Sequence, residues 1–271
     1  MDAFEAIVLG IVQGLTEFLP ISSSAHLRIV PAFAGWDDPG AAFTAVTQLG
    51  TMAAVLLYFR RDLWQITVGF VAGLRDAGQR GTPEWRQGTY LLAGTVPIVI
   101  LGFAFDDQIE DEARNLNLMG VTLIALGLLL LAAERVARRD RDISGVRMKD
   151  AIVIGFAQAA ALIPGVSRSG ATITAGLFLG FDRASAARFS FLLSVPAVVL
   201  SGVYQLGDIG GEGAVGFVPT AIATVFAFVS GYAAIAFLLK FLVSHSTAVF
   251  VVYRVVLGVV VLALVQADVI S

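Results

Sequence analysis

The stretch LPISSSAHL, residues 19–27, decides how this chain must fold, because it places a proline, three consecutive serines and a histidine inside an apolar segment. Proline removes a backbone hydrogen bond from a helix, and serine side chains compete for the backbone hydrogen bonds that remain. We therefore expect the segment to break into two short helices here. In a bilayer, the polar groups at such a break need partners inside the protein.

The composition around this break is that of an integral membrane protein. Of 271 residues, 57% are hydrophobic and 14% are charged, and the mean hydropathy is +0.83. Soluble domains carry about 25% charged residues. The net charge of −3 is too small to predict a nucleic-acid partner. The absence of cysteine excludes disulfides, thiolate metal sites and cysteine nucleophiles.

Six uninterrupted apolar runs approach or exceed the ~20 residues that a helix needs to cross a bilayer. Two further regions, about 3–34 and 151–181, are apolar but interrupted by proline, glycine and serine. We expect an all-α integral membrane protein, a single domain over 1–271, with six full transmembrane helices and two re-entrant helical hairpins. The six runs lie at about 42–59, 88–105, 117–134, 187–206, 217–239 and 248–267.

The distribution of arginine predicts the orientation of these spans. Two arginine-rich connections, one within 60–86 and one within 135–149, should be cytoplasmic by the positive-inside rule. The acidic connection DDQIEDEARN, residues 106–115, lies between them and should face outward, as should Asp208 and Glu212. The chain is thus expected to cross the cell membrane several times.

The two interrupted regions resemble each other at a shift of 145 residues. Each half would cross the membrane an odd number of times, so the second half would be inverted relative to the first. We predict an inverted-topology repeat, with repeat 1 at about 1–134, a cytoplasmic linker at about 135–149 and repeat 2 at about 150–271. Such repeats place polar sites near the midplane. The matched pairs are Gly10 and Gly155, Gln13 and Gln158, Ser22 and Ser167, and Ser24 and Ser169.

The second helix of each interrupted region is expected to begin at its serines. Helices that start at Ser22–Ser24 and at Ser167–Ser169 would present free backbone N–H groups and serine caps to the interface between the repeats. Helix N-termini carry partial positive charge and bind phosphate. Two converging N-termini therefore predict a site for a strongly anionic group.

Glu17 and His26 are the candidate reactive residues of the first region. Gln13 and Glu17 are four residues apart and share a helix face. An acid inside an apolar segment usually marks a pathway or a site; the alternative is a structural ion pair with an arginine. For His26 the alternative is a packed core histidine, but its place across the serine loop from Glu17 favours a functional role. The second histidine, His245, is expected to be solvated.

The second region, PGVSRSGAT at 164–172, contributes a cation. Arg168 has no acidic residue within ten positions, and its planar guanidinium suits bidentate phosphate binding. The alternative is that Arg168 pairs with Glu17 across the repeat interface. Gln48 begins a full span and is a further candidate to line the site, although helix packing explains it equally well.

These motifs resemble those of the undecaprenyl-diphosphatase family, also called the bacitracin-resistance protein family. One family signature is an acid or Gln, then x-x-x-Glu, leading into P-x-S-S-x-x-H, and it is present from Gln13 to His26. The other, P-G-x-S-R-S-G-x-T, is present from Pro164 to Thr172. The resemblance extends over the whole chain, including QLGTMAAVLLYFRRDL and FSFLLSVP.

This resemblance implies a membrane enzyme that hydrolyses undecaprenyl pyrophosphate to undecaprenyl phosphate and inorganic phosphate. The reaction recycles the lipid carrier for cell-wall synthesis and gives bacitracin resistance. The resemblance also implies a divalent cation, Mg²⁺ or Ca²⁺, and an active site that opens to the extracytoplasmic side. Many members have glutamate where this chain has Gln13, so Glu17 is here the only carboxylate of that pair.

For catalysis we expect Glu17, together with Gln13, to hold the cation against phosphate oxygens. His26 is then either the general base or the group that accepts the phosphoryl, and Ser23 is the competing nucleophile with His26 as its base. Attack by water is the third route. The sequence does not separate the three. The residues expected to bind the phosphates are Arg168, Ser22, Ser24, Ser167, Ser169, Thr172 and Gln48.

A transporter or flippase of a phosphate-bearing lipid or an anion would also explain an inverted repeat with broken helices. The set of Glu17, His26 and Arg168 favours the enzyme, since a carrier has less need of a base and a metal ligand. The expected partners are therefore the polyprenyl pyrophosphate substrate and membrane lipid. The sequence is also compatible with a homodimer.

Overall fold

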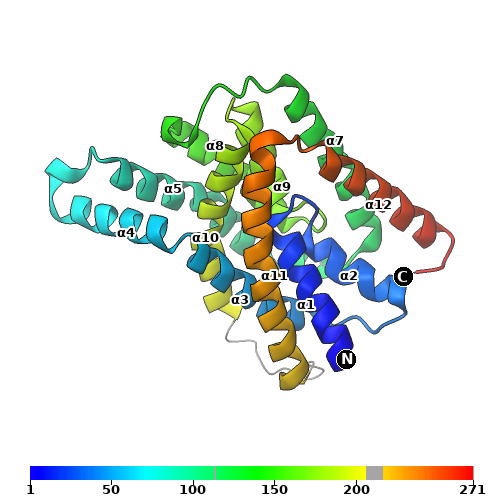
Figure 1. Cartoon of the computed structure of the whole chain (residues 1–271). Helices are drawn as coiled ribbons and strands as arrows, with labels where there is room; N and C mark the ends of the chain where they lie inside the picture. Colours follow the sequence, from blue (N-terminus) through cyan, green and yellow to red (C-terminus); the bar gives the residue numbers. More distant parts are fainter. Residues whose placement is uncertain (113, 206–215, 271) are drawn as a thin grey trace.

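The computed structural model describes residues 1–112, 114–205 and 216–270 (Figure 1). The regular secondary structure of this part of the chain is helical, apart from one isolated β-bridge between Arg141 and Phe181. The all-α fold is confirmed. In chain order the helices are α1 (Ala3–Phe18), α2 (Ser23–Ala34), α3 (Gly40–Tyr58), α4 (Arg60–Arg75), η1 (Ala77–Gln79), α5 (Pro83–Ala104), α6 (Asp106–Glu112), α7 (Leu116–Val136), η2 (Ile143–Gly145), α8 (Met148–Ala159), η3 (Ala160–Leu162), α9 (Arg168–Phe178), α10 (Arg183–Gln205), α11 (Phe217–Ser244) and α12 (Ala248–Gln266).

Five of the described helices, α5, α7, α10, α11 and α12, are long and apolar enough to cross a membrane. A sixth span exists only if α3 and α4 are taken together, and these two helices meet at an angle of 76°. The bend lies at Phe59, which ends α3 and precedes α4. Arg188 of α10 fixes this corner, since it pairs with Asp62 and lies over the Phe59 ring.

The connections contain more helix than we expected from the sequence. Residues 60–86, read as an arginine-rich loop, form α4 and η1 and begin α5. The acidic connection at 106–115 contains α6. Asp208 and Glu212, which we expected on the outer side, lie outside the described residues.

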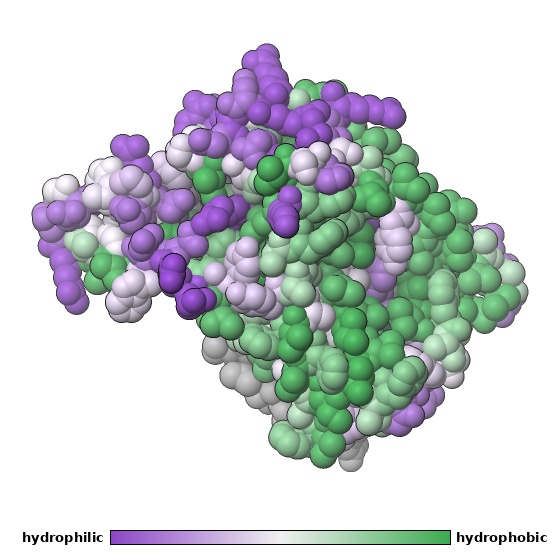
Figure 2. Space-filling model, viewed as in Figure 1, coloured by the Kyte–Doolittle hydropathy of each residue, from purple (hydrophilic) through white to green (hydrophobic). Residues whose placement is uncertain are grey.

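The surface separates into polar and apolar areas. Figure 2 shows hydrophilic residues gathered along the upper and left edges, over the connection between α7 and α8 and the far ends of α4 and α5. Large apolar side chains are exposed elsewhere on the helices long enough to cross a membrane, among them Phe103, Val121 and Val252. Exposed apolar area on this scale is expected of a surface that faces lipid.

The two interrupted regions have the same local geometry. Each breaks between two helices, and the second helix begins after a serine with a positive φ, 75° at Ser22 and 71° at Ser167. Such values are uncommon for residues other than glycine. Each serine caps its helix by accepting a backbone N–H three residues later. Gly35 and Gly180, also 145 residues apart, take positive φ at or near the ends of the same helices.

The first helix of each region packs on a helix from the other half of the chain. α1 lies against α11, and α8 lies against α5. Equivalent glycines permit both contacts: a Cβ on Gly10 would lie 2.3 Å from the Ala223 carbonyl oxygen, and one on Gly155 would lie 2.3 Å from the Gly94 carbonyl oxygen. Small residues allow membrane helices to approach this closely.

Replacing either glycine with alanine is therefore expected to destabilise the protein. Gly10→Ala and Gly155→Ala should each cost about 1–3 kcal/mol through overpacking against backbone atoms, measured as a lower Tm in detergent. Gly145→Ala is the control, because no atom lies within 4 Å of its added Cβ. Equal Tm values for all three variants would contradict the packing described.

Candidate functional site

The two helix breaks contact each other directly. The backbone N–H of Gly165 donates to Ser24 Oγ over 3.5 Å, and Ser169 Oγ donates to the Leu19 carbonyl over 3.0 Å. Each break thus supplies a partner for a backbone group of the other. The N-termini of α2 and α9 are brought together by these contacts.

An ion pair between Glu17 and Arg168 crosses the same junction. Arg168 Nη2 donates to Glu17 Oε1, and the two side chains are 17% and 8% exposed, respectively. Glu17 lies in the last turn of α1, and Arg168 is the first residue of α9. The pairing considered as an alternative from the sequence is thus the one in the structure. It places an acid and a cation, 151 positions apart in the chain, in a single site.

Glu17 also organises the first region. Its Oε2 accepts a hydrogen bond from Ser23 Oγ over 2.7 Å and one from Gln13 Nε2 over 3.3 Å. The Ser23 hydroxyl therefore directs its proton at a carboxylate. Gln13 Oε1 is buried and has no hydrogen-bond partner among the described residues.

His26 is held by a different pair of groups. Its Nδ1 lies 2.6 Å from the Ser22 carbonyl oxygen, and its Nε2 lies 2.7 Å from the Tyr253 hydroxyl. The ring is 5% exposed. Both nitrogens are thus bonded to groups other than Ser23, so the expected arrangement with His26 as the base of Ser23 is not the one in the structure. His245 is exposed, as predicted.

Most of the hydroxyls expected to bind phosphate are bonded within the protein. Ser22 and Ser24 share a hydrogen bond of 3.1 Å, and Ser167 and Ser169 share the equivalent bond of 3.2 Å. These bonds fix the first turns of α2 and α9 at the junction.

Within the described contacts, two of the candidate residues are not bonded to the side chains of the ion pair, although Thr172 donates to the Arg168 carbonyl over 2.8 Å. Thr172 is buried and lies 2.5 Å from Ser190 Oγ of α10, which indicates a supporting role in packing. Gln48 is half-buried on α3, which packs on α1 and α11. Among the described contacts, no hydrogen bond joins the Gln48 side chain to Glu17 or Arg168.

Arg254 is the main residue that sequence reasoning missed. It is 0% exposed and donates to carbonyl oxygens of both breaks, Pro20 in the first and Gly165 and Val166 in the second. It also donates to two carbonyls of α7. An arginine inside the apolar run 248–267 is the same signal that marked Glu17, so the sequence contained a pointer to it.

Oxygen atoms that could bind a hard divalent cation are few around Glu17 in the described part of the chain. Within the described residues, no group of three His, Cys, Asp or Glu side chains could hold a metal ion. The available donors are the Glu17 carboxylate and the buried, unpartnered Oε1 of Gln13. Mg²⁺ commonly takes one or two carboxylates from the protein and the rest from phosphates and water.

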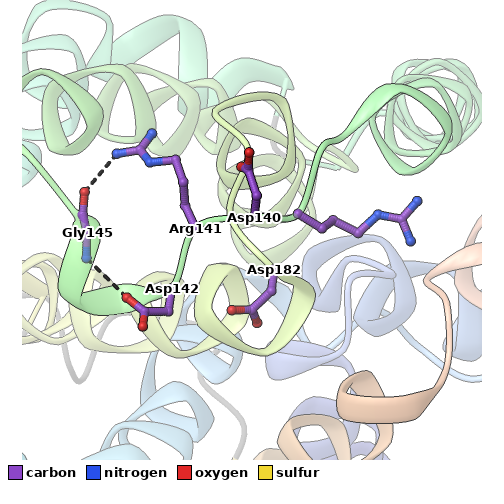
Figure 3. A pocket seen from close by; sticks show the side chains of 6 residues that line it. Asp140, Arg141, Asp142, Gly145 and Asp182 are labelled. Atoms are coloured by element: carbon purple, nitrogen blue, oxygen red, sulfur yellow. Dashed lines mark hydrogen bonds between the residues drawn. The ribbon is translucent and has the colours of Figure 1, made fainter.

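A separate, open pocket of about 410 Å³ lies at the linker between α7 and α8 (Figure 3). Its polar groups bind neighbouring elements: Arg141 pairs with Asp150 of α8, and Asp142 accepts from Ser144. The Ser144 hydroxyl lowers the pKa of the Asp142 carboxyl below its usual value. We therefore read the pocket as a structural junction. It is lined by Arg139, Asp140, Arg141, Asp142, Gly145 and Asp182.

Comparison with known proteins places the sequence in a family. The model of the bacitracin resistance protein BacA family matches residues 6–260. The chain belongs to this family. The resemblance drawn from the two motifs is thus confirmed.

Curated relatives match over nearly their whole length. An undecaprenyl-diphosphatase of Nocardioides sp. is 53% identical over 272 residues, covering 100% of this chain and 99% of the relative. One of Chlorobaculum parvum is 55% identical over 269 residues, 96% and 95% of the two chains. Undecaprenyl-diphosphatase 2 of Streptomyces coelicolor is 48% identical over 283 residues, 100% and 97%.

The role of Arg254 can be tested by removing its charge. Arg254→Leu should leave several buried carbonyls unsatisfied, at about 1–3 kcal/mol each, and should lower the Tm in detergent by roughly 5 °C or more. The exposed Arg135, changed in the same way, serves as the control. A Tm for Arg254→Leu equal to that of the control would show that the two breaks do not depend on it.

Proposed function

We propose that this chain is an undecaprenyl-diphosphatase, which hydrolyses undecaprenyl pyrophosphate to undecaprenyl phosphate and inorganic phosphate. Curated relatives about half identical over the full length carry that name. The observation in the structure that carries the proposal is the contact of Glu17 with both Arg168 and Ser23 where α2 and α9 begin. The comparisons do not favour a transporter or flippase.

The diphosphate would bind between the two helix N-termini. Free backbone N–H groups in the first turns of α2 and α9 suit phosphate oxygens. Arg168 would exchange its bond to Glu17 for phosphate oxygens, which match its planar donors. A pyrophosphate carries enough negative charge to compete with a single carboxylate for this guanidinium.

The contacts favour Ser23 as the nucleophile, with Glu17 rather than His26 as its base. Ser23 Oγ would attack the terminal phosphorus as its proton passes to Glu17, and the bond between that phosphorus and the bridging oxygen would break. Undecaprenyl phosphate then leaves with the bridging oxygen. Water attacks the phosphoserine and releases inorganic phosphate. Phosphoryl transfer to His26 and direct attack by water are the competing routes, and mass spectrometry of a trapped intermediate separates them.

Glu17 and Gln13 Oε1 would hold a divalent cation, Mg²⁺ or Ca²⁺, together with phosphate oxygens of the substrate. When bound, the cation would neutralise charge on the diphosphate. With Glu17 as the single carboxylate, Gln13 must contribute through its neutral amide oxygen.

We further propose that the two broken regions are re-entrant hairpins of an inverted repeat whose site opens to the extracytoplasmic side. Three observations support it: the serine caps 145 residues apart, the matching glycines behind them, and the reciprocal packing of α1 on α11 and α8 on α5. Polar sites at the interface of such repeats lie near the midplane.

Removing the charged or reactive groups should abolish catalysis without unfolding the protein. Glu17→Ala, Arg168→Ala, Ser23→Ala and His26→Ala should each lower phosphate release by roughly a hundredfold or more. The substrate would be a polyprenyl pyrophosphate in detergent, where transport cannot be scored. Arg135→Ala, Ser144→Ala and His245→Ala are the controls. Near-normal turnover in any of the first four removes that residue from the mechanism.

Restoring a second carboxylate tests the cation site. Gln13→Glu should lower the Mg²⁺ or Ca²⁺ concentration that gives half-maximal activity, because two carboxylates bind a hard cation more tightly than one. A chelator should abolish turnover of the unaltered protein. If Gln13→Glu left that concentration unchanged, the cation would not bind at Glu17 and Gln13.

A further inference from the structure

We propose that Tyr253 is a positioning residue for His26, holding the imidazole ring in one orientation through a hydrogen bond to Nε2. This inference rests on the function proposed above, because His26 shares the first turn of α2 with Ser23, the nucleophile proposed there. Tyr253 belongs to α12, far from both motifs in sequence, and neither motif points to it.

The two bonds of His26 determine where its proton lies. A backbone carbonyl can only accept a hydrogen bond, so the 2.6 Å contact with the Ser22 oxygen requires a proton on Nδ1. In the neutral ring Nε2 then carries the free lone pair. Because Tyr253 lies 2.7 Å from Nε2, its hydroxyl must donate to that lone pair. When Nε2 takes up a proton, the hydroxyl turns from donor to acceptor.

The placement of the two rings makes Tyr253 the outward contact of His26. The imidazole is 5% exposed, whereas Tyr253 is 45% exposed. The rings are nearly parallel, with centroids 5.5 Å apart and planes inclined by 9°. The phenol oxygen therefore occupies the Nε2 side of the buried imidazole.

The next residue in the chain fixes this geometry. Arg254 binds carbonyls at both helix breaks, so α12 cannot shift relative to the serine loop without breaking those bonds. One turn of α12 thus supplies both the cation that joins the breaks and the hydroxyl that orients the histidine. A tyrosine anchored in this way holds the ring in the orientation whose tautomer the Ser22 carbonyl sets.

Nitrogen-15 NMR of histidine-labelled protein tests the bond itself, because the chain contains only two histidines. His245→Ala assigns the signals. At a pH where the ring signals no longer change and His26 is neutral, its Nδ1 should be protonated and its Nε2 displaced by a hydrogen bond. In Tyr253→Phe the Nε2 signal should move toward that of an unbonded nitrogen. Tyr232→Phe, whose ring contacts Tyr58, is the matched control and should leave the signal in place.

Phosphate release from a polyprenyl pyrophosphate supplies the second readout. Tyr253→Phe keeps the ring and should lower kcat by about tenfold or more with little change in KM, the scale of one lost hydrogen bond to a reactive group. An unmoved Nε2 signal, or a kcat equal to that of Tyr232→Phe, overturns the inference. If the unaltered protein released no phosphate, the proposed function would be overturned instead. The NMR experiment would still test the hydrogen bond between Tyr253 and His26, because it does not depend on activity.

Discussion

Backbone groups exposed at a helix break have no water to bond inside a bilayer, and this constraint shapes the centre of the molecule. The chain has two such breaks, and each satisfies part of the other through Ser24 and Ser169. Arg254 satisfies further carbonyls of both. The breaks are therefore stable only as a pair. A fold that brings two polar loops together also shelters charged side chains from lipid at their junction.

The two halves contribute different groups to this place. The first brings Glu17, Ser23 and His26, and the second brings Arg168 in the position equivalent to Ser23. Because the acid and the cation come from different halves, neither break holds the ion pair alone. The ion pair keeps the two charges compensated while they are buried, which an unpaired charge could not achieve at acceptable cost. A pyrophosphate would then bind by replacing the carboxylate on the guanidinium.

Much of the fold and the core of the site were predictable from the sequence, because they depend on local pattern. Five of the six long apolar runs correspond to helices that can cross a membrane, and polar residues within the interrupted runs indicated Glu17, His26 and Arg168. Contacts set by three-dimensional packing were not predictable. The partner of Ser23 is Glu17 rather than His26, and Tyr253 and Arg254 reach the site from a helix more than two hundred residues beyond the first motif. The helix α4 was not predicted because its arginines lower the mean hydropathy of an amphipathic segment.

The central claim is that the two helix breaks form one site, and cross-linking in the native membrane tests it most directly. The chain has no cysteine, so Ser23→Cys with Arg168→Cys introduces a single pair. The protein would carry a protease site beside the exposed Arg138, so that cleavage separates the two halves. A short bifunctional reagent that forms disulfides with both thiols would be applied before cleavage. After cleavage the two halves should stay joined until a reductant separates them, whereas Ser23→Cys with Ser144→Cys should give separate halves. Separate halves from the first pair would contradict the account.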